Sequence, residues 1–393
     1  MLSILDCNNF WSPSGGGVRR YHLEKMEYFK TRPDIHYVFV MHDEETYTEQ
    51  IGESAFIEHI KVPKVLGNWE YRYVTRRKQL EPVILKHRPE VIEVGSPYIL
   101  PRIVHSIVRR NNLHSKVFGF WHADFPVTYV RRFLEGAPTG LASLAERLAW
   151  NYARKHYNRM DGTLVASQVI LDRMQAHGLQ NLHFTPLGVN SDLFHPEKRN
   201  EALVKDLKAG EPDRLILFFP HRFSKEKGLQ VLLKAYEMLT ELLPVPPALV
   251  IAGTGPYENL VVEATQKFEH VRFEGFIQRK EEMAEYYASS DMGFALSRWE
   301  TFGLSLVEAL SAGLPLIAAG EGAAREHIEK SGTGMILENI SPLKLAEAIV
   351  HLAKSDRKDL STKARSYATN LSWKSCFDSQ VEIYRCSHNP TLS

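Results

Sequence analysis

Cysteine is scarce in this sequence of 393 residues. The three that occur, Cys7, Cys376 and Cys386, have neither the spacing of a metal site nor that of a disulfide framework. Apolar runs are short, and none approaches the ~18 residues that a membrane-spanning helix requires. The first residues turn acidic at Asp6, which is too early for a signal peptide. These absences predict a cytoplasmic protein, and they leave peripheral contact with the inner face of a membrane open.

Motifs for several common ligands are missing as well. The run Gly15-Gly16-Gly17 matches neither the G-x-G-x-x-G fingerprint of dinucleotide-binding domains nor a P-loop, because no G-K-[ST] follows it. The formal net charge of +1 gives no indication of nucleic acid. Residues 1–185 carry 24 Lys and Arg against 19 Asp and Glu. This mild basic excess suits an anionic acceptor or a membrane surface, and it is at least as compatible with no function at all.

The length of the chain predicts two domains, because a single hydrophobic core seldom grows beyond ~250–300 residues. Short apolar runs separated by helical stretches predict an α/β protein with parallel sheets and helices on both faces. Strands are expected at 36–41, 90–95, 116–121, 162–167, 214–219, 248–252 and 291–297. Residues 182–196 are dense in Pro, Gly, Asn and Asp, which is typical of a linker between domains.

The segment 298–315, R-W-E-T-F-G-L-S-L-V-E-A-L-S-A-G-L-P, is the most informative part of the sequence. A strand is expected just before it, and an apolar helical face follows. Thr301 stands where an N-cap residue would, so we expect free N–H groups at the helix start, ready for an anionic or oxygen-rich ligand. Those amides belong to Phe302, Gly303 and Leu304. Glu300 precedes the helix and Glu308 lies inside it, and two carboxylates at one mouth suit a ligand rich in hydroxyl groups.

These residues form the pattern E-x-F-G-x-x-x-x-E, which A-x-x-A-G-x-P follows. The pattern resembles the E-x7-E signature of retaining glycosyltransferases of family 4, which have the GT-B fold and include bacterial mannosyl- and glucosyltransferases. The resemblance implies that Glu300 contacts the donor sugar, that Glu308 holds the ribose hydroxyls, and that residues 301–304 also bind the donor. It further implies two Rossmann-like domains facing across a cleft. The acceptor domain would span 1–185, the donor domain 186–368, and a crossover helix within 369–393 would pack on the first domain.

Two further motifs of this family occur in the first half of the chain. Gly16-Gly17 is similar to the family's first loop, so the resemblance places both glycines against the donor diphosphate and Arg19 near the acceptor side. H-A-D-F-P, which begins at His122, is similar to the H-x-D-F-P form of family members. A lone histidine after a strand is often only a structural hydrogen-bonding group. The resemblance implies instead that His122 lies against the donor sugar and the reaction centre, with Asp124 close by.

The second half adds a pair of cations on a loop before a helix, in the segment P-H-R-F-S-K-E-K-G-L. Arg222 and Lys227 suit a diphosphate, because Arg can bind two oxygens at once and Lys acts as a point charge. They fall on the family's G-R-x-x-x-x-K-G motif, with His221 in place of a common Gly. Gly253, in G-T-G-P, and Phe276, at the end of a V-x-F-x-G strand, resemble family segments that border the base of the nucleotide.

The resemblance implies retaining transfer of a hexose from a nucleotide sugar to a glycan, lipid or lipid-linked acceptor. GDP-mannose and UDP-hexoses are the expected donors, and the H-x-D-F-P form favours mannose. No D-x-D motif or His/Cys cluster indicates a metal, and no cofactor is expected, because Arg and Lys can neutralise the diphosphate. The implied catalytic residues are His122, Asp124, Arg222, Lys227 and Glu300. No carboxylate is clearly a covalent nucleophile, so retention would come from same-face attack with the leaving phosphate accepting the proton.

Two other functions stay open from the sequence. One is a GT-B enzyme of another kind: an inverting transferase, a nucleotide-sugar epimerase or a phosphorylase. The E-x7-E pattern with the R…K-G loop argues against the first two, and the chain is short for a phosphorylase of the glycogen type. The other is a catalytically silent, nucleotide-sugar-binding partner subunit, which a turnover assay would distinguish.

Overall fold

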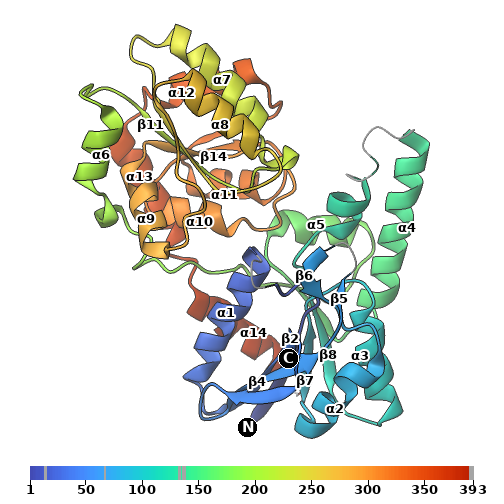
Figure 1. The fold of residues 1–393 in the computed structure, drawn as a ribbon. Coiled ribbons are helices and arrows are strands. Elements are labelled where there is room, and N and C mark those ends of the chain that lie inside the picture. The colour runs from blue at the N-terminus through green and yellow to red at the C-terminus, as the bar shows by residue number, and fades with distance from the viewer. Residues whose placement is uncertain (13–15, 66–67, 132–133, 135–138, 389–393) are drawn as a thin grey trace. The chain divides into compact units, whose positions relative to one another are not determined.

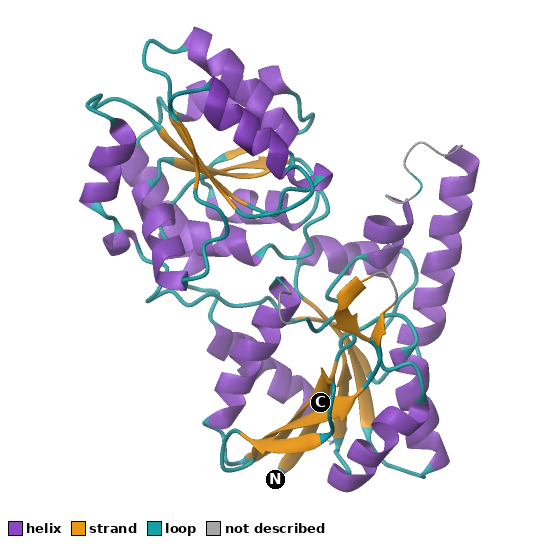
Figure 2. Cartoon of the chain, in the orientation of Figure 1, coloured by secondary structure: helices purple, strands orange, loops and turns teal. Residues whose placement is uncertain are grey.

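The structure, a computed structural model, describes residues 1–12, 16–65, 68–131, 134 and 139–388. The chain forms two compact units: unit 1 consists of residues 1–187 with 373–393, and unit 2 of residues 188–372. In each unit, helices cover both faces of a largely parallel sheet (Figure 1, Figure 2). No helix of the described part is both long and apolar enough to cross a membrane.

Unit 1 is built on an eight-stranded sheet. Its strands are β1 (Leu2–Cys7), β2 (Ile35–Asp43), β3 (Tyr47–Gln50), β4 (Ala55–Lys61), β7 (Val91–Val94), β8 (Lys116–Phe120), β9 (Gly162–Val165) and β10 (Leu182–Phe184). Their order is β10-β9-β8-β7-β1-β2-β4-β3, and all neighbours are parallel except β3 and β4 at one edge. The strands β5 (Lys64–Val65) and β6 (Asn68–Arg72) form a separate antiparallel pair.

The helices of unit 1 come from both ends of the chain. They are α1 (Gly17–Lys30), α2 (Arg77–His87), α3 (Leu100–Arg110), a π-helical segment (Pro126–Arg131), α4 (Thr139–Tyr157), α5 (Gln168–Ala176) and α14 (Trp373–His388). Helix α14 follows all of unit 2 in the sequence, yet it packs on unit 1 beside α1 (Figure 1). Its side chains Phe377 and Tyr384 are fully buried there.

A buried ion network holds α14 to the centre of the unit 1 sheet. Glu93 on β7 lies 2.7 Å from the Lys25 ammonium and accepts hydrogen bonds from the hydroxyl groups of Tyr21 and Tyr384. Lys25 also lies 3.0 Å from Asp6 on β1, and all these side chains are shielded from solvent. Burial raises the pKa of Asp6, but Lys25 and His22 outweigh it and hold that pKa well below its ordinary value. We call Asp6, Lys25, Glu93, Tyr21 and Tyr384 the Glu93 network.

Unit 2 is built on a six-stranded, fully parallel sheet. Its strands are β11 (Ile216–Pro220), β12 (Ala248–Ala252), β13 (Val271–Phe273), β14 (Met292–Ala295), β15 (Leu316–Ala319) and β16 (Met335–Leu337). Its helices are α6 (Glu201–Lys208), α7 (Leu229–Leu242), α8 (Glu258–Lys267), α9 (Lys280–Ser289), α10 (Leu304–Ser311), α11 (Ala323–Ser331), α12 (Pro342–Leu352) and α13 (Arg357–Ala368). Short 3-10 turns occupy Pro196–Lys198 and Lys225–Lys227.

Helices cover both faces of the unit 2 sheet, so the side chains on both faces of each strand are shielded from water. The strands can therefore be continuous apolar runs. Strands β12, β14 and β15 are buried along their whole length. The sheet order is β13-β12-β11-β14-β15-β16. From β11 the chain continues to β12 and β13 on one side of the sheet, and from β14 it continues to β15 and β16 on the other. In doubly wound sheets, ligands usually bind to the loops at the carboxyl ends of such a central strand pair.

Candidate functional site

The loop that leaves β11 is fixed across the centre of the unit 2 sheet by His221. The ring Nε2 lies 2.6 Å from the carbonyl oxygen of Phe294 on β14. A carbonyl can only accept, so Nε2 carries the proton. Burial, reinforced by the nearby Lys227 ammonium, lowers the pKa of His221 to about 4, so the ring is neutral at pH 7. Through this bond His221, which directly follows β11, links the end of β11 to β14.

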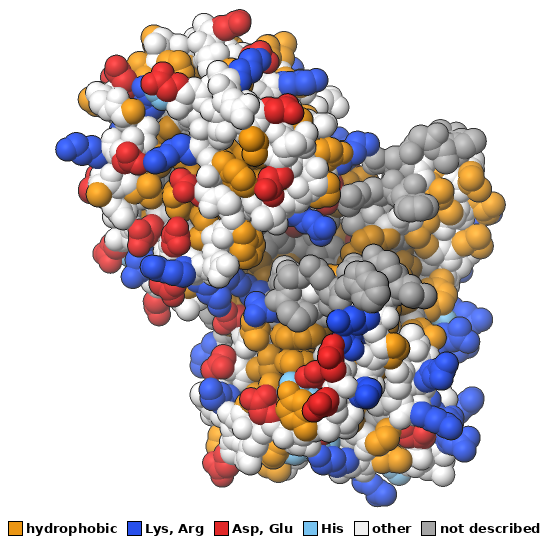
Figure 3. All heavy atoms as spheres, in the orientation of Figure 1, with side chains coloured by type: hydrophobic (Ala, Val, Ile, Leu, Met, Phe, Trp, Pro, Cys, Tyr) orange, Lys and Arg blue, Asp and Glu red, His pale blue; other side chains and the backbone are white. Residues whose placement is uncertain are grey.

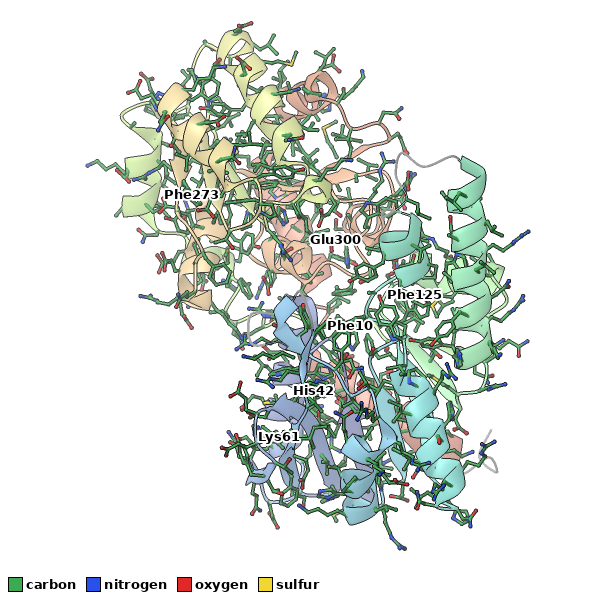
Figure 4. All side chains as sticks on the ribbon, turned by 45° about the vertical axis from the view of Figure 1, so that its right-hand side comes forward. Phe10, His42, Lys61, Phe125, Phe273 and Glu300 are labelled. Atoms are coloured by element: carbon green, nitrogen blue, oxygen red, sulfur yellow. The ribbon has the colours of Figure 1, made fainter. Side chains whose placement is uncertain are left out.

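Lys227 and Glu300 form an ion pair at this edge of the sheet. Lys227 ends the 3-10 turn before α7, and Glu300 lies on the loop between β14 and α10, where Figure 4 labels it. Their side chains are 23% and 17% exposed. Burial raises the pKa of Glu300, but the Lys227 ammonium outweighs it and keeps the carboxylate ionised at neutral pH. Arg222, on the same loop as Lys227, is exposed.

Helix α10 begins later than the sequence predicts. Its N-cap is Gly303, with φ +83°, and its first residue is Leu304. The expectation that Thr301 caps this helix is therefore wrong: the left-handed turn at Gly303, which a side chain would strain, separates Thr301 and Phe302 from the helix. Neither Gly303 N–H nor Leu304 N–H donates to another group of the described chain. Glu308 lies on α10 and is 8% exposed.

The loop before α10 rests on the start of α11. The N–H of Ala323 donates to the carbonyl oxygen of Glu300 at 3.1 Å. Gly322 is the N-cap of α11, and a Cβ there would lie 2.9 Å from Arg298 O and 3.1 Å from Glu300 O. This close approach fixes the backbone beside Glu300 without using its carboxylate.

Gly253 and Phe276 lie on the loops after β12 and β13, beside the His221 loop. Gly253 has φ +137°, and a Cβ there would lie 2.1 Å from His221 O. Its N–H donates to Gly275 O at 2.6 Å. The side chain of Phe276 is 66% exposed. The structure thus brings Gly253 against the Arg222 and Lys227 loop, and it leaves Phe276 at the surface of the same unit.

In unit 1, the sheet order makes β1 and β7 the corresponding central pair. Helix α1 starts after β1, with Gly16 as its exposed N-cap and Gly17 as its first residue. Gly15, the first of the three expected glycines, lies outside the described residues. Arg19 is half-buried on the first turn of α1.

His122 follows β8 and packs against the second turn of α1. Its ring stacks on Phe120, with ring centroids 4.2 Å apart, and meets the edge of Tyr21 at 5.0 Å. The His22 ring lies 5.6 Å away. Burial lowers the pKa of His122 well below its ordinary value, and the charges of His22 and Lys25 add to this, so His122 is neutral at pH 7. The structure therefore brings His122 close to the helix that Gly17 opens.

Asp124 is directed to a different partner. It is 2% exposed, and its Oδ2 lies 2.5 Å from the Arg173 guanidinium on α5. Burial raises the pKa of Asp124, and the attraction of Arg173 only partly offsets this. The pair ties the loop after β8 to α5, so a structural role for Asp124 stands beside the expected catalytic one.

Sequence reasoning missed one residue of unit 2 that contacts the site. His327, on α11, is 3% exposed, and its Nε2 lies 2.7 Å from the carbonyl oxygen of Phe302. Helical periodicity predicts only that position 327 is buried, so the hydrogen bond from His327 to Phe302 O could not be predicted from the sequence. No group of three or more His, Cys, Asp or Glu side chains in the described chain could hold a metal ion.

Two family models match the chain. The model described as Glycosyltransferase Family 4 matches residues 15–193, and the model described as Glycosyl transferases group 1 matches residues 202–370. A GDP-mannose-dependent alpha-(1-6)-phosphatidylinositol dimannoside mannosyltransferase of Mycobacterium tuberculosis is 30% identical over 382 residues, which are 95% of this chain and 93% of that protein. Sulfoquinovosyl transferase SQD2 of Arabidopsis thaliana is 25% identical over 84% of this chain, and the match spans 66% of its length.

Solved structures share the fold at low identity. A sucrose-phosphate synthase from Thermosynechococcus elongatus superposes with a TM-score of 0.79 at 17% identity, covering 100% of both chains. WaaG, a glycosyltransferase involved in lipopolysaccharide biosynthesis, has a TM-score of 0.69 at 16% identity, covering 97% of this chain and 99% of its own.

Proposed function

Because this chain belongs to family 4 of the glycosyltransferases and has their GT-B fold, we propose that it is a retaining hexosyltransferase. It would transfer mannose, or a glucose-type hexose, from a nucleotide sugar to a glycan, lipid or lipid-linked acceptor. The observation that carries this proposal is the Lys227–Glu300 pair beside the start of α10, at the carboxyl edge of a doubly wound sheet. One charged pair there combines a cation for phosphate with a carboxylate for sugar hydroxyls.

The proposed roles follow from the charge and burial of each group. Arg222 and Lys227 would stabilise the negative charge that develops on the departing diphosphate, which is commonly the largest electrostatic contribution to such a transfer. The ionised Glu300 would hold the donor sugar, and Glu308 the ribose hydroxyls. The amides of Gly303 and Leu304, with Gly253 and Phe276, would complete the donor site on unit 2.

Unit 1 would supply the acceptor side. A neutral His122 can donate one hydrogen bond and accept another without placing a positive charge beside an oxocarbenium-like sugar. Gly16 and Gly17 would approach the diphosphate, Arg19 would face the acceptor, and Asp124 would support the His122 loop through Arg173. The acceptor nucleophile would attack from the face that the diphosphate leaves, and a phosphate oxygen would take its proton.

GDP-mannose is the donor we favour. The H-x-D-F-P form of residues 122–126 supports it. So do the names of several relatives, which are GDP-mannose-dependent mannosyltransferases of Corynebacterium glutamicum and Mycobacterium species.

We also propose that unit 1 meets a membrane surface through α4. Three leucines along this helix, Leu141, Leu144 and Leu148, are 52%, 43% and 58% exposed. Figure 3 shows hydrophobic side chains on the outer side of this helix. Arg147 and Arg154 lie on the same helix, and an apolar stripe flanked by Arg suits the interface of an anionic bilayer. Such contact would give access to a lipid-linked acceptor.

A panel of nucleotide sugars tests the function. Wild-type protein is incubated with GDP-mannose, UDP-glucose, UDP-galactose, UDP-N-acetylglucosamine and ADP-glucose, and thermal shift and slow donor hydrolysis are followed. We expect stabilisation and hydrolysis with GDP-mannose. Binding without turnover, even with acceptors added, would favour a silent partner subunit, and no response to any donor would contradict the proposed function.

Two variants separate binding from turnover. Glu308→Ala should weaken nucleotide binding about tenfold or more, because it removes a carboxylate that accepts from two ribose hydroxyls. His122→Ala should leave nucleotide binding nearly unchanged and remove turnover. Glu329→Ala is a matched control, since Glu329 is exposed on α11 and pairs with Arg325. Wild-type binding by the Glu308 variant, or normal turnover by the His122 variant, would contradict the assigned roles.

A further inference from the structure

Two consecutive hydrogen bonds, through His327 and Tyr367, hold the peptide group between Phe302 and Gly303. The Nε2 of His327 lies 2.7 Å from Phe302 O, and its Nδ1 lies 2.7 Å from the hydroxyl oxygen of Tyr367 on α13. The rings of Phe302 and His327 also meet edge to face, with centroids 4.9 Å apart. Helices α11 and α13 together therefore fix one carbonyl of the loop before α10.

The partners of His327 determine where its proton is. Phe302 O can only accept, so Nε2 must carry the hydrogen, and the neutral ring then accepts at Nδ1 from the hydroxyl of Tyr367. Burial lowers the pKa of His327 to about 4, which agrees with a neutral ring. The donor and acceptor of both hydrogen bonds are thus fixed: the Tyr367 hydroxyl donates to His327 Nδ1, and His327 Nε2–H donates to Phe302 O.

The orientation of this carbonyl also orients an amide. In a planar trans peptide the C=O and the N–H point in opposite directions. A Phe302 carbonyl that points toward α11 therefore turns the Gly303 N–H away from α11. Gly303 adopts φ +83°, so the chain then turns directly into α10. The next amide, Leu304 N–H, opens the helix beside it.

We propose that His327 and Tyr367 are positioning residues for the donor: they hold the Phe302–Gly303 peptide so that the Gly303 amide can donate to the nucleotide-sugar. This inference rests on the proposed function, because it concerns how the proposed donor site holds its backbone in position for binding. The geometry favours it over simple filling of space. An aliphatic side chain would fill a buried position on α11 without the cost of desolvating an imidazole, whereas only a ring with a fixed N–H holds this carbonyl.

Four variants test the proposal in the full-length protein. GDP and UDP are each titrated by calorimetry, and donor KM, kcat and Tm are measured. His327→Phe keeps an aromatic ring and removes both hydrogen bonds, so we expect nucleotide Kd and donor KM to rise about tenfold. Tyr367→Phe removes only the outer donor, and we expect a rise of about threefold. His327→Gln places an amide N–H near the position of Nε2 and should restore most of the loss, whereas His327→Asn, with its amide nearer Nδ1, should not.

Tyr236→Phe is the matched structural control. Tyr236 is 1% exposed in the same unit, and its hydroxyl donates to Pro247 O at 2.8 Å, away from the loop. This variant should lower Tm without changing donor KM. If Tyr367→Phe and His327→Asn leave donor KM unchanged, as Tyr236→Phe does, and His327→Phe either does so too or fails to fold, the positioning role is overturned. Failure of the wild-type protein to bind GDP or UDP would instead overturn the proposed function itself.

Discussion

Removing the ammonium of Lys25 should destabilise unit 1 severely. Lys25→Met keeps much of the side-chain volume but leaves Asp6 and Glu93 without the cation that lies 3.0 Å and 2.7 Å from them. Both carboxylates are fully shielded from solvent. Removing one partner of a buried ion pair costs about 3–5 kcal/mol, a large share of the ~5–15 kcal/mol that stabilises a typical domain. With a urea m-value of about 2 kcal/mol/M, the unfolding midpoint of unit 1 should fall by roughly 2 M.

Tryptophan fluorescence is a suitable probe of this loss, because five of the six tryptophans belong to unit 1. Lys30→Met is the matched control on the same helix, since Lys30 is 48% exposed and lies 3.7 Å from Glu27. It should change the free energy of unfolding by less than about 0.5 kcal/mol. The loss in Lys25→Met should also shrink as pH falls, because burial without Lys25 raises the pKa of Asp6 and lets the carboxyl take up a proton. An unfolding free energy within about 0.5 kcal/mol of wild type would refute the reasoning.

Two further predictions concern pH and membranes. His42, on β2, is buried like His221 and His327. Burial lowers the pKa of each of the three histidines to about 4 in the fold, against about 6.5 in the unfolded chain, so the unfolded chain binds more protons between these values. Their contribution is fully present above pH 6.5 and is lost as pH falls toward 4. Urea unfolding at pH 5 should therefore show a loss of about 2 kcal/mol per histidine relative to pH 7.5, and equal stability at both would contradict it. In vesicle co-sedimentation with phosphatidylglycerol, replacing Leu141, Leu144 and Leu148 with Gln should reduce binding about a hundredfold. Leu242→Gln, at a leucine 57% exposed in unit 2, should not, and equal binding of both variants would contradict a membrane role for α4.

The family and the fold could be predicted from the sequence because their signals are local. The E-x7-E pattern occupies a single loop and helix, and the two family models and the solved structures confirm the family and its GT-B fold. The expected strands at 116–121 and 248–252 correspond to β8 and β12, since continuous apolar runs bounded by loops mark strands buried on both faces. The roles of the site residues stay predictions.

What escaped prediction depends on contacts that are distant in the sequence. The sequence predicts a helix start at Thr301 because a Thr before an apolar run is typical of an N-cap, whereas the left-handed turn at Gly303 that delays the helix is visible only in the backbone. The hydrogen bond between Tyr384 and Glu93 joins residues 291 positions apart in the sequence, and that between His327 and Phe302 joins residues 25 positions apart. Polar residues that are buried in this way follow the same spacing as the apolar residues around them, so no periodicity distinguishes them.

The place of α14 has a consequence for the order of events during synthesis. A ribosome delivers unit 1 strands and helices first, and an N-terminal unit can ordinarily fold before later parts emerge. Here the carboxylate of Glu93 lacks the hydroxyl of Tyr384 until the whole of unit 2 has been translated. The first unit to be made is therefore the last to be completed, and a chain interrupted within unit 2 would keep the site of Phe377 and Tyr384 open to chaperones and proteases.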